Sequence, residues 1–84
     1  MAYQVLILPA ADKVVAKLPK AVRARIAEQL VSLADNPRPH GSVKLKDQES
    51  YRVRVGDYRI IYTIEDKKLI VLVIEVGHRR DVYR

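Results

Sequence analysis

A twelve-residue segment from Tyr51 to Tyr62 constrains the fold more than any other part of this sequence. Before Gly56-Asp57, apolar and charged residues alternate with the period of two that is typical of a half-buried β-strand. Gly-Asp is a common two-residue loop of a β-hairpin, and Tyr58 to Ile64 predicts the returning strand. The sequence therefore predicts a tight antiparallel hairpin at this position.

The turn also fixes which residues of the two strands face each other. A two-residue loop pairs Val55 with Tyr58 and Arg54 with Arg59, and further pairs follow outward from the turn. One face is expected to pack against helices; it carries Tyr51, Val53, Val55, Tyr58, Ile60 and Tyr62. The opposite face carries Arg52, Arg54 and Arg59. Charge on a sheet face is usually a solvated surface, but two arginines directly opposite each other repel. We interpret the pair as a site for a bridging anion such as phosphate.

The sequence on either side of the hairpin predicts the remaining elements. A short apolar stretch, Tyr3–Leu8, predicts a first strand. Apolar residues then recur with helical spacing in Ala10–Leu18 and in Val22–Leu33, and Pro19 separates the two helices. After the hairpin, Leu69–Ile74 is apolar on both faces, which is typical of a central strand.

The predicted order of elements is β-α-α-β-β-β. It defines an α+β fold in which an antiparallel sheet packs against an N-terminal helical hairpin. Eighty-four residues hold one small domain, which we place over residues 1–84.

Charge and composition narrow the classes of function. Sixteen Lys and Arg against ten Asp and Glu give a net charge of +6, which indicates an anionic partner. Nucleic acid is the first choice, an acidic protein the second and a membrane surface the third. The absence of cysteine excludes disulfides, thiolate zinc sites and cysteine nucleophiles. No apolar run approaches the roughly 18 residues of a membrane span, and no signal pattern begins the chain. We therefore expect a cytoplasmic protein without membrane contact.

The residue types available for chemistry are few. The sequence has no Gly-rich phosphate loop, no nucleophile elbow and no histidine or acidic spacing that suits a metal, so we expect no cofactor and no metal. Any catalysis has to use Arg, Lys or Tyr, with His as a further option. Such a set suits cleavage of RNA, where the substrate's own 2′-hydroxyl can attack the phosphate. In addition to the hairpin arginines, Arg79-Arg80 form a second basic cluster in the sequence. Tyr83 either stacks on a base or covers the edge of the core.

Three segments together resemble one protein family. They are Lys44-Leu45, the hairpin Tyr51–Tyr62 and the C-terminal Val73–Tyr83, with the pattern K-L…Y-R-x-R-x-G-x-Y-R-x-x-Y…V-x-x-x-G-H-R-R-x-x-Y. This pattern, with the order of elements, resembles the RelE branch of the RelE/ParE toxin superfamily over essentially the whole chain. The resemblance implies a toxin of a type II toxin–antitoxin system that enters the ribosomal A site and cleaves mRNA there. It also implies neutralisation by a cognate RelB-like antitoxin, through which alone the toxin would contact operator DNA.

The resemblance also implies which residues form the site. The catalytic residues would be Arg54, Arg59, Arg79 and Tyr83. The RNA-binding residues would be Lys44, Lys46, Arg52, His78 and Arg80. Arg54 departs from the family, in which a lysine at this position can be argued as a proton acceptor. A guanidinium stays protonated, so Arg54 would instead stabilise charge. The base would then be His78, Lys44 or Lys46, or a group of the ribosomal RNA.

Two other functions fit the same sequence. One is a ParE-like toxin that inhibits gyrase and has no ribonuclease activity. The other is a non-catalytic nucleic-acid-binding module, which the charge alone permits. The presence of the full set of arginines together with Tyr83 favours the ribonuclease.

Overall fold

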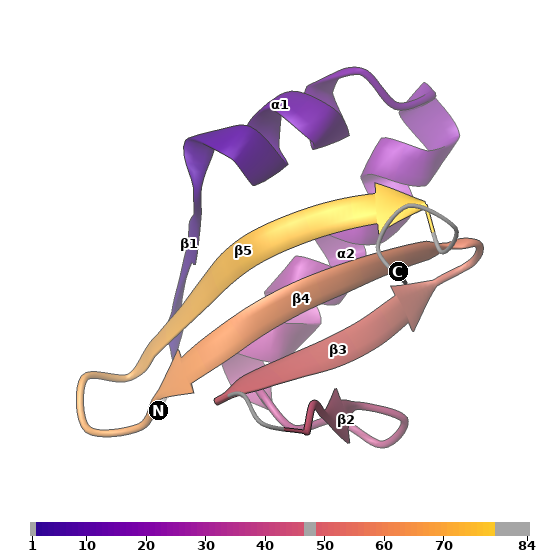
Figure 1. Cartoon of the computed structure of the whole chain (residues 1–84). Coiled ribbons are helices and arrows are strands. Elements are labelled where there is room, and N and C mark those ends of the chain that lie inside the picture. Colours follow the sequence, from indigo (N-terminus) through magenta and orange to yellow (C-terminus); the bar gives the residue numbers. More distant parts are fainter. Residues whose placement is uncertain (1, 47–48, 79–84) are drawn as a thin grey trace.

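The computed structural model describes residues 2–46 and 49–78. Its elements are β1 (Gln4–Ile7), α1 (Pro9–Ala16), α2 (Lys20–Asp35), β2 (Val43–Lys44), β3 (Ser50–Val55), β4 (Tyr58–Glu65) and β5 (Ile70–His78). The five strands form one mixed sheet in the order β1-β5-β4-β3-β2. Helix α2 crosses behind the sheet, and α1 runs alongside β5 (Figure 1). The α+β fold expected from the sequence is confirmed.

Three details of the sheet go beyond the sequence prediction. β1 pairs with β5 in parallel, whereas the other neighbouring strands are antiparallel. β2 is an added edge strand of two residues, too short for a periodic signal. β5 continues to His78, past the predicted end at Ile74, although Glu75 and Gly77 interrupt its apolar run. Each helix packs on the sheet itself: α1 contacts β5, and α2 contacts β1 and β3.

The hairpin has the register that the sequence predicts. Val55 pairs with Tyr58 and Arg54 with Arg59, and the pairing continues without a break to Ser50 and Thr63. Gly56 has φ +59°, and Asp57 is not among the residues with positive φ. This is the pattern of a type II′ turn, in which glycine takes the first central position.

A β-bulge interrupts the pairing of β4 with β5. Tyr62 pairs with Val73, whereas the preceding Ile61 pairs with Glu75, so Ile74 is the extra residue. The extra residue reverses the alternation of side chains along β5. Val76, which pairs with Ile60, is therefore buried in the core.

The core lies between the sheet and the two helices. The apolar stripe of α2 supplies the fully buried Ile26 and Leu33, with Val22 and Leu30 packed around them. From the sheet come Val53, Val55, Ile60, Tyr62, Val71, Val73 and Val76. The arginines of the hairpin consequently lie on the face turned away from the helices.

Arg38 holds the loop after α2 against the sheet. Its Nη1 and Nη2 donate to the two carboxylate oxygens of Asp66 at 3.1 and 2.9 Å, and its Nε donates to the Tyr51 hydroxyl at 3.2 Å. The Tyr3 hydroxyl donates to the same carboxylate at 2.7 Å. Hydrogen bonds from Arg38 and then from Tyr3 lower the pKa of Asp66 to about 2. These four residues, which we call the Arg38 clasp, join the segment just before β1, the loop after α2, β3 and the β4–β5 turn.

Candidate nucleic-acid interface

Three hairpin arginines that are predicted to bind an anion lie on the outer face of the sheet, and we call them the arginine row: Arg52, Arg54 and Arg59. Arg54 on β3 is the cross-strand partner of Arg59 on β4, and Arg59 is the partner of Gly77 on β5. Directly opposed residues share a face, and Gly77 brings no side chain to its place in the row. Arg52 lies on the same face, two residues before Arg54, opposite Ile61. The hairpin therefore brings three of the predicted site residues together.

The exposure of the row differs from the expectation of an open charged face. Arg54 is exposed, but Arg59 is only 2% exposed and is among the largest fully buried side chains. The gap between Arg54, Gly56, Tyr58 and Arg59 has a volume of about 10 Å³. A space of this size holds about one water molecule. A phosphate reaches Arg59 only if the groups that cover it move aside.

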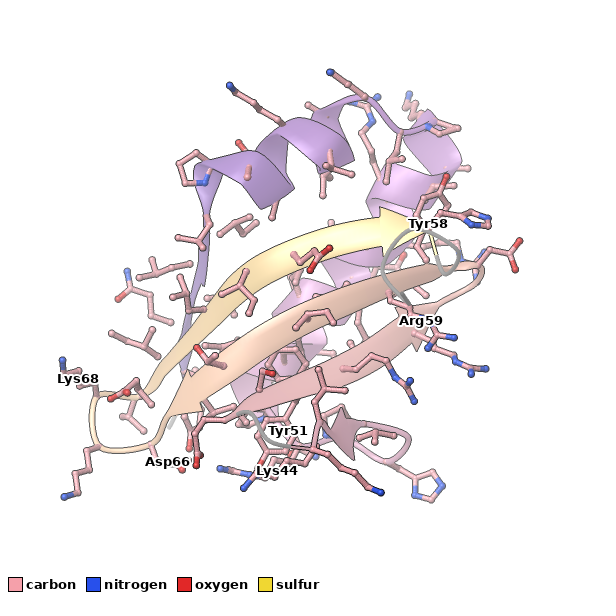
Figure 2. The ribbon with its side chains drawn as sticks, viewed as in Figure 1. Lys44, Tyr51, Tyr58, Arg59, Asp66 and Lys68 are labelled. Atoms are coloured by element: carbon pink, nitrogen blue, oxygen red, sulfur yellow. The ribbon has the colours of Figure 1, made fainter. Side chains whose placement is uncertain are left out.

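His78 lies on the other face of the sheet. It is the cross-strand partner of Tyr58, and the two rings meet edge to face with their centroids 5.5 Å apart. Tyr58 and Arg59 are consecutive on one strand, so their side chains point to opposite faces, as Figure 2 shows for the two labelled residues. The structure does not bring the His78 ring to the arginine row.

The remaining predicted residues lie at the sheet edge or outside the described ranges. Lys44 and Lys46 are both exposed, and Lys44 pairs with Tyr51 at the edge farthest from β1. Lys44 therefore lies on the Tyr51 face of the sheet, away from the arginine row. Arg79, Arg80 and Tyr83 fall outside the residues that the structure describes, and their roles stay predictions.

A groove next to the arginine row was not expected from the sequence. It has a volume of about 380 Å³ and lies between α2 and the β3–β4 turn. Its lining consists of Arg25, Glu28, Gln29, Ser32, Arg54, Val55 and Gly56. Arg25 precedes the buried Ile26 on α2, so helical geometry places it beside the core-facing stripe. That position is the signal in the sequence that could have pointed to Arg25.

Within 2–46 and 49–78, no three His, Cys, Asp or Glu side chains are grouped so that they could hold a metal ion. In the same ranges, neither helix has the length and apolar character that crossing a membrane requires.

The fold and the arginine row define a small two-layer α+β domain with a cationic site on its outer sheet face. Comparison with known proteins gives the family. The chain belongs to the family of ParE toxins of type II toxin–antitoxin systems, whose model matches residues 5–83. The resemblance to the RelE/ParE superfamily is thereby confirmed.

Its relatives are RelE-like toxins. The chain is 36% identical to a RelE-like toxin protein of Escherichia coli over 99% of this chain and 92% of that protein. It is 31% identical to the mRNA interferase toxin RelE of Escherichia coli K12 over 75% of this chain and 68% of that protein. Among solved structures, the archaeal RelE–RelB complex of Pyrococcus horikoshii matches with a TM-score of 0.85 and 32% identity. That match covers 94% of this chain and 97% of the other.

Proposed function

We propose that this protein is a ribosome-dependent endoribonuclease toxin that cleaves mRNA in the ribosomal A site and so inhibits translation. The observation that carries the proposal is the Arg54–Arg59 pair, aligned across two strands on the outer sheet face. Folding alone does not favour two opposed arginines, whereas an RNA phosphate would bind to both. The relatives named mRNA interferase support the same activity.

The proposed reaction uses the substrate's own 2′-hydroxyl as the nucleophile and side chains of this kind to stabilise charge. The 2′-hydroxyl loses its proton and attacks the adjacent phosphorus, a 2′,3′-cyclic phosphate forms, and the 5′-oxygen leaves and takes up a proton. Negative charge grows on the phosphate oxygens during attack, and donors already in place stabilise it. Arg59 would hold these oxygens once the groups that cover it have moved aside, and the exposed Arg54 would guide the RNA strand. Arg79 and Tyr83 complete the proposed catalytic set.

The base is the part of the site that the chain supplies least well. Arginines remain protonated, and the His78 ring packs on Tyr58 on the opposite face. Lys44 lies on that face as well. We therefore favour a group of the ribosome as the base over His78, Lys44 or Lys46. Free RNA would then be a poor substrate.

The proposed partners are the ribosome with its mRNA and a RelB-like antitoxin. The Pyrococcus horikoshii neighbour was solved as a complex of RelE with RelB, which supports a cognate antitoxin for this chain. Operator DNA would be contacted only through that complex. The proposed site of action is the cytoplasm, where the ribosomes are.

Primer extension on programmed ribosomes tests the proposal. Purified protein is mixed with ribosomes that carry a defined codon in the A site, and the cDNA ends are mapped. Cleavage confined to the A-site codon, with the same mRNA intact when free, is the expected result. Intact mRNA on ribosomes, with protein of verified fold, would refute the proposed function.

A second candidate function is inhibition of gyrase, because the matching family model is that of ParE toxins. A supercoiling assay with purified gyrase separates the two candidates. Blocked supercoiling together with intact ribosomal mRNA would establish the ParE-like function. Normal supercoiling with A-site cleavage would exclude it.

A further inference from the structure

The groove between α2 and the β3–β4 turn continues the arginine row around the edge of the hairpin. Arg54 lines both the small gap beside Arg59 and the larger groove beside Arg25. The groove has a volume of about 380 Å³, far more than the gap of about 10 Å³. An extended nucleic-acid strand that contacts Arg54 would therefore have room to continue on the side of α2.

Arg25 lies directly against the turn at Gly56. A Cβ atom built on Gly56 would lie 3.4 Å from Nη1 and 3.7 Å from Nη2 of Arg25. Among the described residues, neither Arg25 nor Arg54 has a hydrogen bond or an ion pair. Two guanidinium groups with available donors thus border one groove. A guanidinium fits phosphate oxygens with several parallel donors.

The lining favours a polar anion over an apolar peptide. Of its seven residues only Val55 is a large apolar one, and Val55 is 8% exposed. An amphipathic helix docks through apolar anchors in a hydrophobic groove, which this lining does not offer. One carboxylate, Glu28, also borders the groove, and its negative charge partly offsets the positive charge of the two arginines. Glu28 therefore weakens the attraction of the groove for a phosphate, so its removal should strengthen binding.

We propose that Arg25 and Arg54 form a second phosphate site, which binds the backbone of the RNA strand one or more nucleotides away from the cleaved bond. The proposal rests on the proposed function for its choice of RNA as ligand. Arg25 would be a binding residue, so its loss would raise KM for programmed ribosomes and leave kcat nearly unchanged.

The test measures binding of a short 2′-O-methyl RNA by fluorescence anisotropy across a series of KCl concentrations. This probe lacks the nucleophilic hydroxyl, so binding is measured without cleavage. Each phosphate contact on a single strand contributes about 0.7 to the slope of log affinity against log salt. Arg25→Gln should lower the slope by about this amount and weaken binding about two- to fivefold.

Two matched variants separate a local contact from damage to the fold. Arg23→Gln removes the same charge from an exposed position of α2 that does not line the groove, and it should leave the slope unchanged. Glu28→Gln removes the opposing charge and should tighten binding. Melting curves of all three variants should match the wild type, because these residues are exposed.

The outcomes also separate this inference from the proposed function. If wild-type protein cleaves ribosomal mRNA but Arg25→Gln and Arg23→Gln have equal slopes, the groove inference alone is wrong. If Arg25→Gln lowers the slope but the wild type cleaves nothing, the proposed function alone is wrong. If Arg25→Gln leaves RNA binding intact but slows association with the antitoxin, the groove contacts an acidic protein segment, which overturns the inference.

Discussion

Arg59 carries a permanent charge at a position that is almost completely removed from solvent, with 2% of its surface exposed. Charged side chains are rarely found in such places. A guanidinium held by its surroundings has fixed donors, and charge interactions are stronger away from water. Such a donor stabilises a transition state without having to reorganise during the reaction. Both the charge and the shape of Arg59 should therefore matter for cleavage.

Replacement of Arg59 by alanine should lower the rate of A-site cleavage by about 10²–10³-fold, the usual loss for one transition-state donor. Arg59→Lys should restore only part of the rate, because an ammonium lacks the planar fork of donors. Single-turnover cleavage on programmed ribosomes measures both variants. Melting curves identify any loss of fold, since alanine also leaves a cavity at this buried position. Wild-type rates in both folded variants would show that Arg59 has no catalytic role.

Asp66 in the Arg38 clasp should make stability depend on pH at the acidic end. Its pKa in the folded protein is about 2, below the ordinary value of about 3.9 in an unfolded chain. The folded state therefore binds this proton less readily, and the stabilisation is complete above pH of about 4 and lost as the pH falls toward 2. Asp66→Asn should lower the melting temperature at pH 7 by a few degrees at most, because both partners are about half exposed, with side chains 45% and 54% accessible.

The melting temperatures of the wild type and of Asp66→Asn should converge between about pH 4 and 2. Asp57→Asn is the matched control, because Asp57 is exposed and has no hydrogen bond within the described part of the chain. A constant difference between Asp66→Asn and the wild type across this range would mean that the clasp does not act through the charge of Asp66.

For single residues, the sequence predicts the place of a side chain in the sheet better than it predicts how buried that side chain is. The pairing of Arg54 with Arg59 follows from the two-residue turn, which permits one register. The burial of Arg59 does not follow from the register, which fixes only its cross-strand partners. Arg25 was missed for the same reason: its place beside Gly56 depends on how α2 packs on β3.

At the scale of elements, the β3–β4 hairpin depends on one backbone conformation. Gly56 has φ +59°, in the left-handed region that glycine adopts without strain. A Cβ atom there would make only an ordinary contact with Arg25, 3.4 Å away. The requirement for glycine therefore comes from the backbone and not from crowding.

Gly56→Ala should destabilise the protein by about 1–2 kcal/mol, the usual cost of a left-handed conformation for an L-residue. Asp57→Ala, in the same turn but without positive φ, should cost much less. Urea unfolding measures both free energies of unfolding. Equal stabilities for Gly56→Ala and the wild type would show that the turn changes its type without penalty.

The elements that were predicted have strong local signals, and the ones that were missed have none. Both helices and the hairpin strands are marked by periodicity and by prolines or glycine. β2 has two residues and exists only because it pairs with β3. The bulge at Ile74 likewise depends on the alignment of β5 with β4, which lies beyond the reach of a local pattern.

The whole molecule carries a net charge of +6, with its arginine row on the face opposite the helices. Such a field attracts acidic partners over distances comparable to the screening length, about 10 Å at 0.1 M salt. The fold class of the whole molecule can be predicted from the order of elements in the sequence. The parallel pairing of β1 with β5 cannot be predicted in this way, because it joins segments that are far apart in the sequence.

Association with the antitoxin should be fast at low salt and should slow about tenfold or more as KCl rises from about 0.05 to 0.5 M. Dissociation should change little, because apolar contacts set its rate. Stopped-flow fluorescence across the salt series gives both rates. An association rate that does not vary with salt would mean that the antitoxin first meets a part of the surface without net charge.

The bulge in β5 divides this strand into two structural modules. The first, Ile70–Val73, pairs with both β1 and β4 and belongs to the scaffold. The second, from Glu75 onward, pairs with β4 and places Gly77 beside Arg59. The extra residue Ile74 absorbs the change of register between the two modules. Loss of Ile74 should straighten the strand while Gly77 keeps its place opposite Arg59 and the core residue Val76 keeps its place opposite Ile60.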